Sequence, residues 1–282
     1  MTQPICRTLY GSYLQTALLM KLSNWACMPL TTLNEKFNIQ SGVYPAAGVL
    51  PSLGYWTIGN GGHTFSVDAN GIAIPTPIQH IATDAALYNH LPFVLRPIAN
   101  DITTAEQALY GLRRIEQYNG AAYVAYYLRR MVLTDVIAAM ELINVASGVT
   151  TVTPFVANNS NLNPTPPVLS SSGVNLTTGN YAAASAQLSL LLGAADITEL
   201  INVANVKYND PNAAIISEVG LCSGIDAVVS SPAVNNTQIS FNEAIAVQIV
   251  SFINTFYPVQ YSNNAITLLL DVGATEPLLT LS

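Results

Sequence analysis

The chain has 282 residues, of which 9% are charged and 50% are hydrophobic, and its formal net charge is −7 at pH 7. Soluble domains usually carry about 25% charged residues, so this composition argues against a free monomer with a conventional charged surface. Neutral amides and hydroxyls cost far less to bury than ions. We therefore expect much of the surface to be covered by other subunits, the alternative being an unusually apolar monomer.

The chain has three cysteines, Cys6, Cys27 and Cys222. An odd number of cysteines cannot all form disulfides within one chain. These cysteines indicate free thiols in a protein made in a reducing cytoplasm. The first 30 residues lack the pattern of a signal peptide. The uncharged stretch between Glu243 and Asp271 is interrupted by Pro258, so we expect no membrane span.

Residues 1–145 predict an N-terminal β-rich region. Leu14–Leu22 favours a short helix, and Thr64–Val67 alternates as a strand before a turn at Asp68–Gly71. Residues 83–91 favour a further helical stretch that Pro92 ends.

Another short helix is expected where Thr103 and Glu106 have the spacing of a capping box.

Residues 113–130 give the clearest local signal. Asn119-Gly120 separates two runs of aromatic and β-branched residues, which predicts a β-hairpin with a type I′ turn. Tyr123 and Tyr127 fall on one face of the second strand. Arginine pairs flank the hairpin at its open end, so we expect them to cluster in space.

Charge is divided unevenly. Residues 1–130 hold eight basic and six acidic groups, whereas residues 131–282 hold one basic and ten acidic groups. Five arginines form what we call the basic strip: Arg96, Arg113, Arg114, Arg129 and Arg130. Nucleic-acid binding is disfavoured, because few arginines in an acidic protein release few counterions. The strip is either a solvated face or a contact with the acidic face of a neighbouring copy, which would close a ring head to tail.

Residues 146–181 predict an extended arm or linker. The segment lacks charge and carries Pro164, Pro166 and Pro167, which favour extended backbone. It is either a flexible linker or an ordered arm that lies on a neighbour through apolar anchors such as Phe155 and Leu162. Before it, Asp135–Val145 fits a helix or a strand, and we favour the strand because a β-rich run follows.

Residues 182–282 predict a C-terminal α+β domain with a β-α-β-α-β order. The expected strands are 184–192, 215–222 and 265–271. The first helix is expected from an N-cap at Asp196, with Glu199 at N3, to Lys207. The second is expected over 244–256, where Ile245, Ile249, Phe252, Ile253 and Phe256 fall at helical spacing. The fold class is thus α+β, mainly antiparallel sheet with a few short helices and a long extended arm.

Catalytic patterns are weak. His63, His80 and His90 lie outside zinc motifs, and each is expected to be a neutral structural histidine. The glycine cluster at 59–62 lacks the remainder of a phosphate-binding loop. Cys222 is the one conceivable nucleophile, and a hydrolase is therefore a minor alternative. We expect no enzyme activity, no cofactor and no metal.

Five stretches, taken in order, carry a resemblance: Ile58-Gly59-Asn60-Gly61-Gly62-His63, and residues 83–96, 125–130, 160–167 and 271–278. Together they resemble a family of virion structural proteins of tailed bacteriophages, over about residues 58–278. The resemblance implies a non-catalytic particle component and leaves neck, tail and baseplate open.

These observations lead to a structural protein of the virion, made in the host bacterial cytoplasm. The leading hypothesis is a neck or tail protein that forms a homo-oligomeric ring around the DNA path. Its partners would be its own copies and a connector, tail tube or sheath, with no membrane and no specific nucleic-acid contact. A baseplate, capsid-surface or host-binding protein is the alternative. The candidate interface residues are the basic strip together with Tyr123, Tyr127, Phe155, Leu162, Pro164, Pro166 and Pro167.

Overall fold

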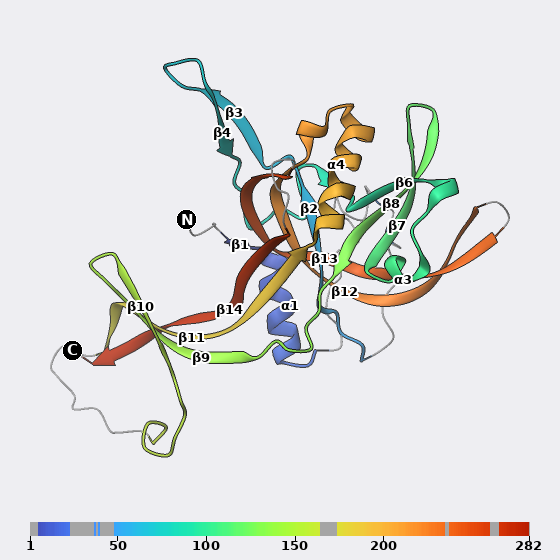
Figure 1. The fold of residues 1–282 in the computed structure, drawn as a ribbon. Coiled ribbons are helices and arrows are strands. Elements are labelled where there is room, and N and C mark those ends of the chain that lie inside the picture. Colours follow the sequence, from blue (N-terminus) through green and yellow to red (C-terminus); the bar gives the residue numbers. More distant parts are fainter. Residues whose placement is uncertain are drawn as a thin grey trace. The chain divides into compact units, whose positions relative to one another are not determined.

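The computed structural model describes residues 5–22, 37, 39, 48–163, 174–234, 237–259 and 265–281. They form mainly antiparallel β-sheet with a few short helices, so the expected α+β class is confirmed (Figure 1). The chain divides into two compact units. The first unit comprises residues 1–132 and 192–266, and the second unit comprises residues 133–191 and 267–282.

The first unit is built on an antiparallel sheet of eight strands. Along the main path the order is β1 (Ile5–Arg7), β13 (Thr237–Pro258), β12 (Ile215–Val234), β2 (Ser52–Gly59), β8 (Ala121–Arg130) and β6 (Val94–Pro97). In addition, β5 (His90–Leu91) pairs with β2, and β7 (Tyr110–Tyr118) pairs with β8. A separate hairpin joins β3 (His63–Val67) to β4 (Ala73–Pro77). Its turn is the expected one, because the Asp68 carboxylate accepts from the backbone N–H groups of Asn70 and Ile72.

Three α-helices are described in this unit: α1 (Leu9–Leu19), α3 (Thr104–Gln107) and α4 (Ala194–Tyr208). Short 3₁₀ turns follow β6 (Ile98–Asn100) and α4 (Pro211–Ala213). The Thr103–Glu106 capping box is confirmed. The α4 start was predicted late: Asp196 lies at N3, where its carboxylate accepts from the Gly193 N–H at 2.7 Å.

The 113–130 hairpin is confirmed. Tyr118 pairs with Ala121, and the two turn residues Asn119 and Gly120 both have positive φ, as a type I′ turn requires. Residues 124–128 of β8 are buried on both faces. Tyr126 is among the largest fully buried side chains of the core, together with Trp56 and Phe93, whose rings meet edge to face at 4.9 Å.

The helix predicted over 244–256 is wrong, because this segment lies within strand β13. Residues 243–249 are buried without interruption, and this part of β13 pairs with β12. A strand that is buried on both faces has a continuous apolar run, which periodicity alone cannot distinguish from a buried helix. A left-handed residue, Ala246, and register shifts against β12 mark irregular pairing in this strand. The predicted C-terminal order is therefore wrong at its second helix, whereas the strands expected over 184–192, 215–222 and 265–271 correspond to parts of β11, β12 and β14.

The second unit is a four-stranded sheet in the order β10–β9–β11–β14. Its strands are β9 (Ala138–Ala146), β10 (Val149–Pro154), β11 (Val174–Leu192) and β14 (Ile266–Leu281). The strand favoured over 135–145 is thus confirmed. The extended-arm prediction for 146–181 is wrong at both ends, where β10 and β11 pair with β9. Residues 155–163 are irregular, and 164–173 lie outside the described residues.

The predicted divisions at 145/146 and 181/182 do not coincide with the two units. Strands β12 and β13 belong to the last third of the chain, yet they lie in one sheet with β2 and β8. Long-range strand pairing therefore joins regions that the sequence presents as separate.

Candidate functional site

Every arginine of the basic strip forms a salt bridge inside the first unit. The pairs are Arg96–Glu199, Arg113–Asp101 (3.0 Å), Arg114–Glu243 (2.7 Å), Arg129–Asp196 (2.7 Å) and Arg130–Asp226. Four of these carboxylates come from the acidic half of the sequence. The Arg129 Nη1 is close to its carboxylate but not aligned for a hydrogen bond, so that contact is electrostatic. The complementary charges of the two halves thus meet within one chain.

This pairing overturns the electrostatic reason for placing the basic strip at a subunit interface. A cation already matched by a carboxylate of its own chain has little charge left to attract an acidic neighbour. Arg113 and Tyr127 are buried inside the first unit, so an interface role for these two residues is wrong. Burial and the neighbouring Glu116 carboxylate raise the pKa of the Tyr127 hydroxyl well above its usual range.

The other interface candidates have different positions. Tyr123 is half-buried and meets the Tyr118 ring edge to face. Phe155 is half-buried, Leu162 is exposed, and the three prolines of 164–167 lie outside the described residues. For these residues an interface role stays a prediction.

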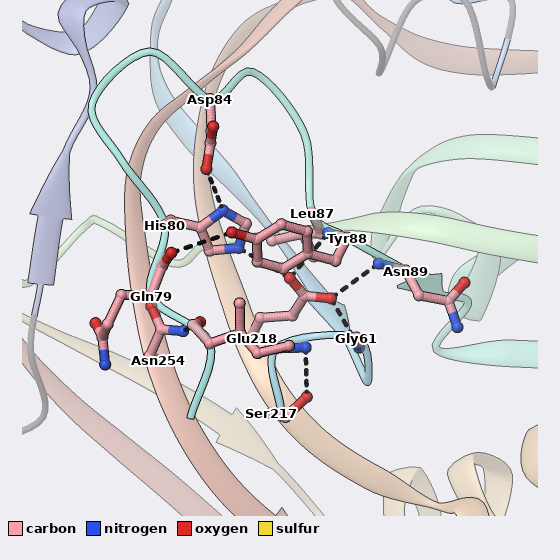
Figure 2. A network of polar contacts seen from close by, with 12 residues as sticks. Gly61, Gln79, His80, Asp84, Leu87, Tyr88, Asn89, Ser217, Glu218 and Asn254 are labelled. Atoms are coloured by element: carbon pink, nitrogen blue, oxygen red, sulfur yellow. Dashed lines mark hydrogen bonds and ion pairs between the residues drawn. The ribbon is translucent and has the colours of Figure 1, made fainter. Parts of the chain in front are cut away.

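The most concentrated polar cluster in the first unit is a buried network around Glu218 of β12 (Figure 2). Its Oε1 accepts from the backbone N–H groups of Gly61 (2.9 Å) and Asn89 (3.0 Å). Its Oε2 accepts from the Tyr88 N–H (3.0 Å) and lies 2.9 Å from His80 Nε2. Four donors therefore converge on one carboxylate with no solvent exposure.

The His80 ring has polar contacts at both nitrogens and aromatic rings stacked against it. Its Nδ1 lies 2.9 Å from Asp84 Oδ2, and its ring stacks between Tyr88 and Phe252, with centroids 4.3 Å and 3.9 Å away. Each nitrogen of the His80 ring therefore faces a carboxylate oxygen. The prediction of a structural histidine agrees with this environment.

The network also explains why the helix predicted over 83–91 is wrong. Backbone N–H groups at Tyr88 and Asn89 donate to Glu218, and the Leu87 N–H donates to His90 Nε2. In a helix these groups would donate to carbonyls four residues earlier. The side chains therefore replace the helical ladder. The sequence offered one sign of this network, an isolated glutamate within the apolar strand 215–222.

The His80 and Glu218 side chains have no solvent exposure, and their polar atoms contact other groups of the same chain. Catalysis at this network is therefore physically disfavoured, because a substrate could not reach these two side chains. Cys222 is also buried, and burial raises the pKa of its thiol far above the usual range. A thiol in this state is a poor nucleophile. Within the described residues there is no group of three or more His, Cys, Asp or Glu side chains arranged to hold a metal. Nor does any described helix have the length and hydropathy to cross a membrane.

The second unit contrasts with this interior. It holds four acidic residues and no basic ones. Its sheet exposes large apolar side chains on strands β9 and β10, among them Met140, Leu142, Val145, Val149 and Val152. The strand register places Met140, Leu142 and Val149 on one face and Val145 and Val152 on the other. The β9–β10 part of this sheet therefore carries exposed apolar side chains on both faces.

A family model matches residues 1–282, and its description is a family of unknown function, DUF7208. No curated protein and no solved structure matches the chain.

Proposed function

The chain belongs to the DUF7208 family, whose function is unknown, and we propose that it is a structural subunit of a tailed-phage virion. In this proposal it is a neck or tail protein that is made in the bacterial cytoplasm and forms a ring around the DNA path. Its neighbours are further copies of itself and a connector, tail tube or sheath.

The observation that carries the proposal is the exposed apolar sheet of the second unit. Domains normally bury each apolar sheet face under a second layer. Covering a large aliphatic side chain yields about 1.5–3 kcal/mol relative to leaving it in water. The five side chains named above lie on both faces of one sheet, so their burial requires contacts from outside the described sheet. Subunit packing is the simplest source of such contacts.

Charge supports the same proposal. The first unit matches its strip arginines with its own carboxylates, and the second unit carries few ions. Few unmatched ions have to be dehydrated when such a chain packs into an assembly. The phage part of the proposal rests on the resemblance of stretches between residues 58 and 278 to virion structural proteins.

The test has two parts. Mass photometry of the purified chain should reveal a discrete oligomer that grows with concentration, and proteomics of purified phage particles should find the chain in multiple copies. A stable monomer at every concentration, together with absence from particles, would sink the proposal.

One observation favours a second candidate, a capsid-surface or host-binding protein. The β3–β4 hairpin exposes Phe65, Val67 and Ile74, and Phe65 and Val67 share a face with Ala73 and Pro75. This candidate predicts a trimer with the hairpin at the particle periphery. Labelling a cysteine placed at Val67 in intact particles separates the two candidates, because a hairpin in a neck or tail ring should be shielded.

A further inference from the structure

The second unit has two open sheet edges. Strands β10 and β14 lie at opposite ends of the order β10–β9–β11–β14, and each has one hydrogen-bonded neighbour among the described strands. An edge strand presents unpaired N–H and C=O groups that can pair with another chain. Proteins usually guard such edges with charged side chains, lysine above all, and this unit contains no basic residue.

β10 is an unguarded edge. All six of its residues, Val149–Pro154, are exposed, and none is charged. The Phe155 N–H donates to the Met140 carbonyl, which fixes the phase of the antiparallel ladder. Residues 151 and 153 therefore bond inward to β9, because inward and outward groups alternate along a strand. The N–H and C=O groups of Thr150 and Val152 point away from the sheet.

Proline supports this assignment. Pro154 follows the same alternation as Val152, so its missing N–H would also have pointed outward and costs the sheet no ladder bond. The free part of the edge is thus a short stretch centred on Thr150–Val152, with valine and threonine side chains that favour strand pairing.

The charges on the two edge strands indicate which edge β10 pairs with. β14 carries Asp271 and Glu276, so antiparallel pairing of two β14 edges would bring like charges together. β10 has no ionised side chain to attract a charged foreign peptide or to repel β14. Pairing of β10 with β14 joins an uncharged edge to an acidic one, and a second copy of the chain offers that edge.

We infer that β10 of one copy adds to β14 of the next, so that the four-stranded sheets of neighbouring copies become continuous. This inference rests on the proposed function and specifies how the copies join. The contact is a strand addition between unlike edges. It is heterologous, and it therefore produces a closed ring where the rotation between copies closes.

The test blocks one edge without disturbing the sheet. Val152→Pro removes an outward N–H and no ladder bond to β9, whereas Val152→Thr keeps that N–H and serves as the matched control. Thermal unfolding followed by circular dichroism should give both variants similar midpoints. Val152→Lys is a second block that keeps the N–H and places a charge at the edge, in case the proline variant fails to fold.

Mass photometry should show wild type and Val152→Thr as oligomers and Val152→Pro alone as a monomer. Fluorescently labelled Val152→Pro, mixed in small amounts with wild type, should still join through its intact β14 and shorten the oligomers. If Val152→Pro and Val152→Lys assemble like wild type, the edge inference is wrong while the proposed assembly stands. If labelled Val152→Pro never joins wild type, β10 pairs with β10 and the head-to-tail contact is wrong. A wild-type chain that stays monomeric contradicts the proposed function itself.

Discussion

The first unit pairs the five arginines of the basic strip with its own carboxylates and holds a buried glutamate that accepts from four donors. The second unit carries four acidic residues and exposes apolar side chains on both sheet faces. The low fraction of charged residues therefore has a different structural consequence in each unit. In the first unit the arginines of the basic strip are paired with carboxylates of the same chain. The second unit has few ions, and it is the unit where we expect a partner to pack.

Because the two units differ in this way, we expect substitutions in the first unit to affect folding stability and substitutions in the second unit to affect assembly. Substitutions in the polar networks of the first unit should change the free energy of unfolding, because each removes a partner that burial makes necessary. Substitutions on the exposed sheet of the second unit should change association and leave unfolding nearly unaltered.

Glu218→Gln should give the largest effect. The glutamine amide nitrogen is a donor, so it would face other donors and leave the His80 ring without one of its carboxylates. Each buried donor that loses its acceptor costs about 1–3 kcal/mol, so we expect a total loss of about 3–5 kcal/mol in urea unfolding followed by tryptophan fluorescence. Glu276→Gln, an exposed control, should change stability by less than about 0.5 kcal/mol. A loss below about 1 kcal/mol at Glu218 would show that the network does not stabilise the fold.

Arg129→Glu should destabilise the first unit by about 2 kcal/mol, since its half-buried site would hold two like charges. Adding Asp196→Arg should recover part of that loss by restoring the pair in reverse. Lys21→Glu makes the same change in net charge at an exposed position and should cost little. If Arg129→Glu abolished oligomers while unfolding stayed unchanged, the strip would be an interface after all.

Alkaline pH should weaken the first unit. Burial, with smaller contributions from nearby charges, raises the pKa of Tyr110 to about 12, and burial likewise raises the pKa values of Tyr55 and Tyr126. Above pH 10 the unfolded tyrosines lose protons that the folded ones keep, so stability is full below pH 10 and falls as pH rises toward 12. The loss is about 1.4 kcal/mol for each pH unit and each tyrosine held neutral. Absorbance at 295 nm and unfolding at each pH measure this, and Tyr110→Phe should reduce the slope. Full ionisation of these tyrosines near pH 10 in the folded protein would contradict it.

The double change Met140→Ser with Leu142→Thr should have the smallest effect on folding, within about 0.5 kcal/mol, because both side chains are exposed. Its effect on association should be a rise of at least about tenfold in the dissociation constant, since apolar area is lost at the contact. Val67→Ser on the β3–β4 hairpin is the matched control in the first unit. Equal effects of the two changes on oligomer size would remove the distinction between the units.

Local chemistry was predictable from the sequence. The 113–130 hairpin depends on Asn119-Gly120, and the α3 cap depends on Thr103 and Glu106, so neighbouring residues specify each structure. Non-local pairing was not predictable. The run 244–256 has helical spacing but forms a strand that pairs with β12, and with β1 at residues 251–253.

For the candidate sites, too, the local features were predictable from the sequence and the long-range contacts were not. The basic strip was visible as a set of arginines, but four of its five carboxylate partners lie far away in the sequence, the most distant at Glu243. The His80–Glu218 contact joins residues that are 138 positions apart, and single-residue patterns give no register for such a contact. The exposure of the second sheet could not be read from residues 146–181, because a run of Val and Thr fits an arm and an edge strand equally well.

Amide hydrogen exchange measured across a range of protein concentrations tests the central claim most directly. In the first unit, amides of β8 and β13 should be protected at every concentration, because those strands are buried within the chain. In the second unit, the outward amides at Thr150 and Val152 and those on the open edge of β14 within residues 271–276 should gain protection only as oligomers form. Oligomers that form while β10 and β14 continue to exchange as in the monomer would contradict the claim that this sheet joins the copies.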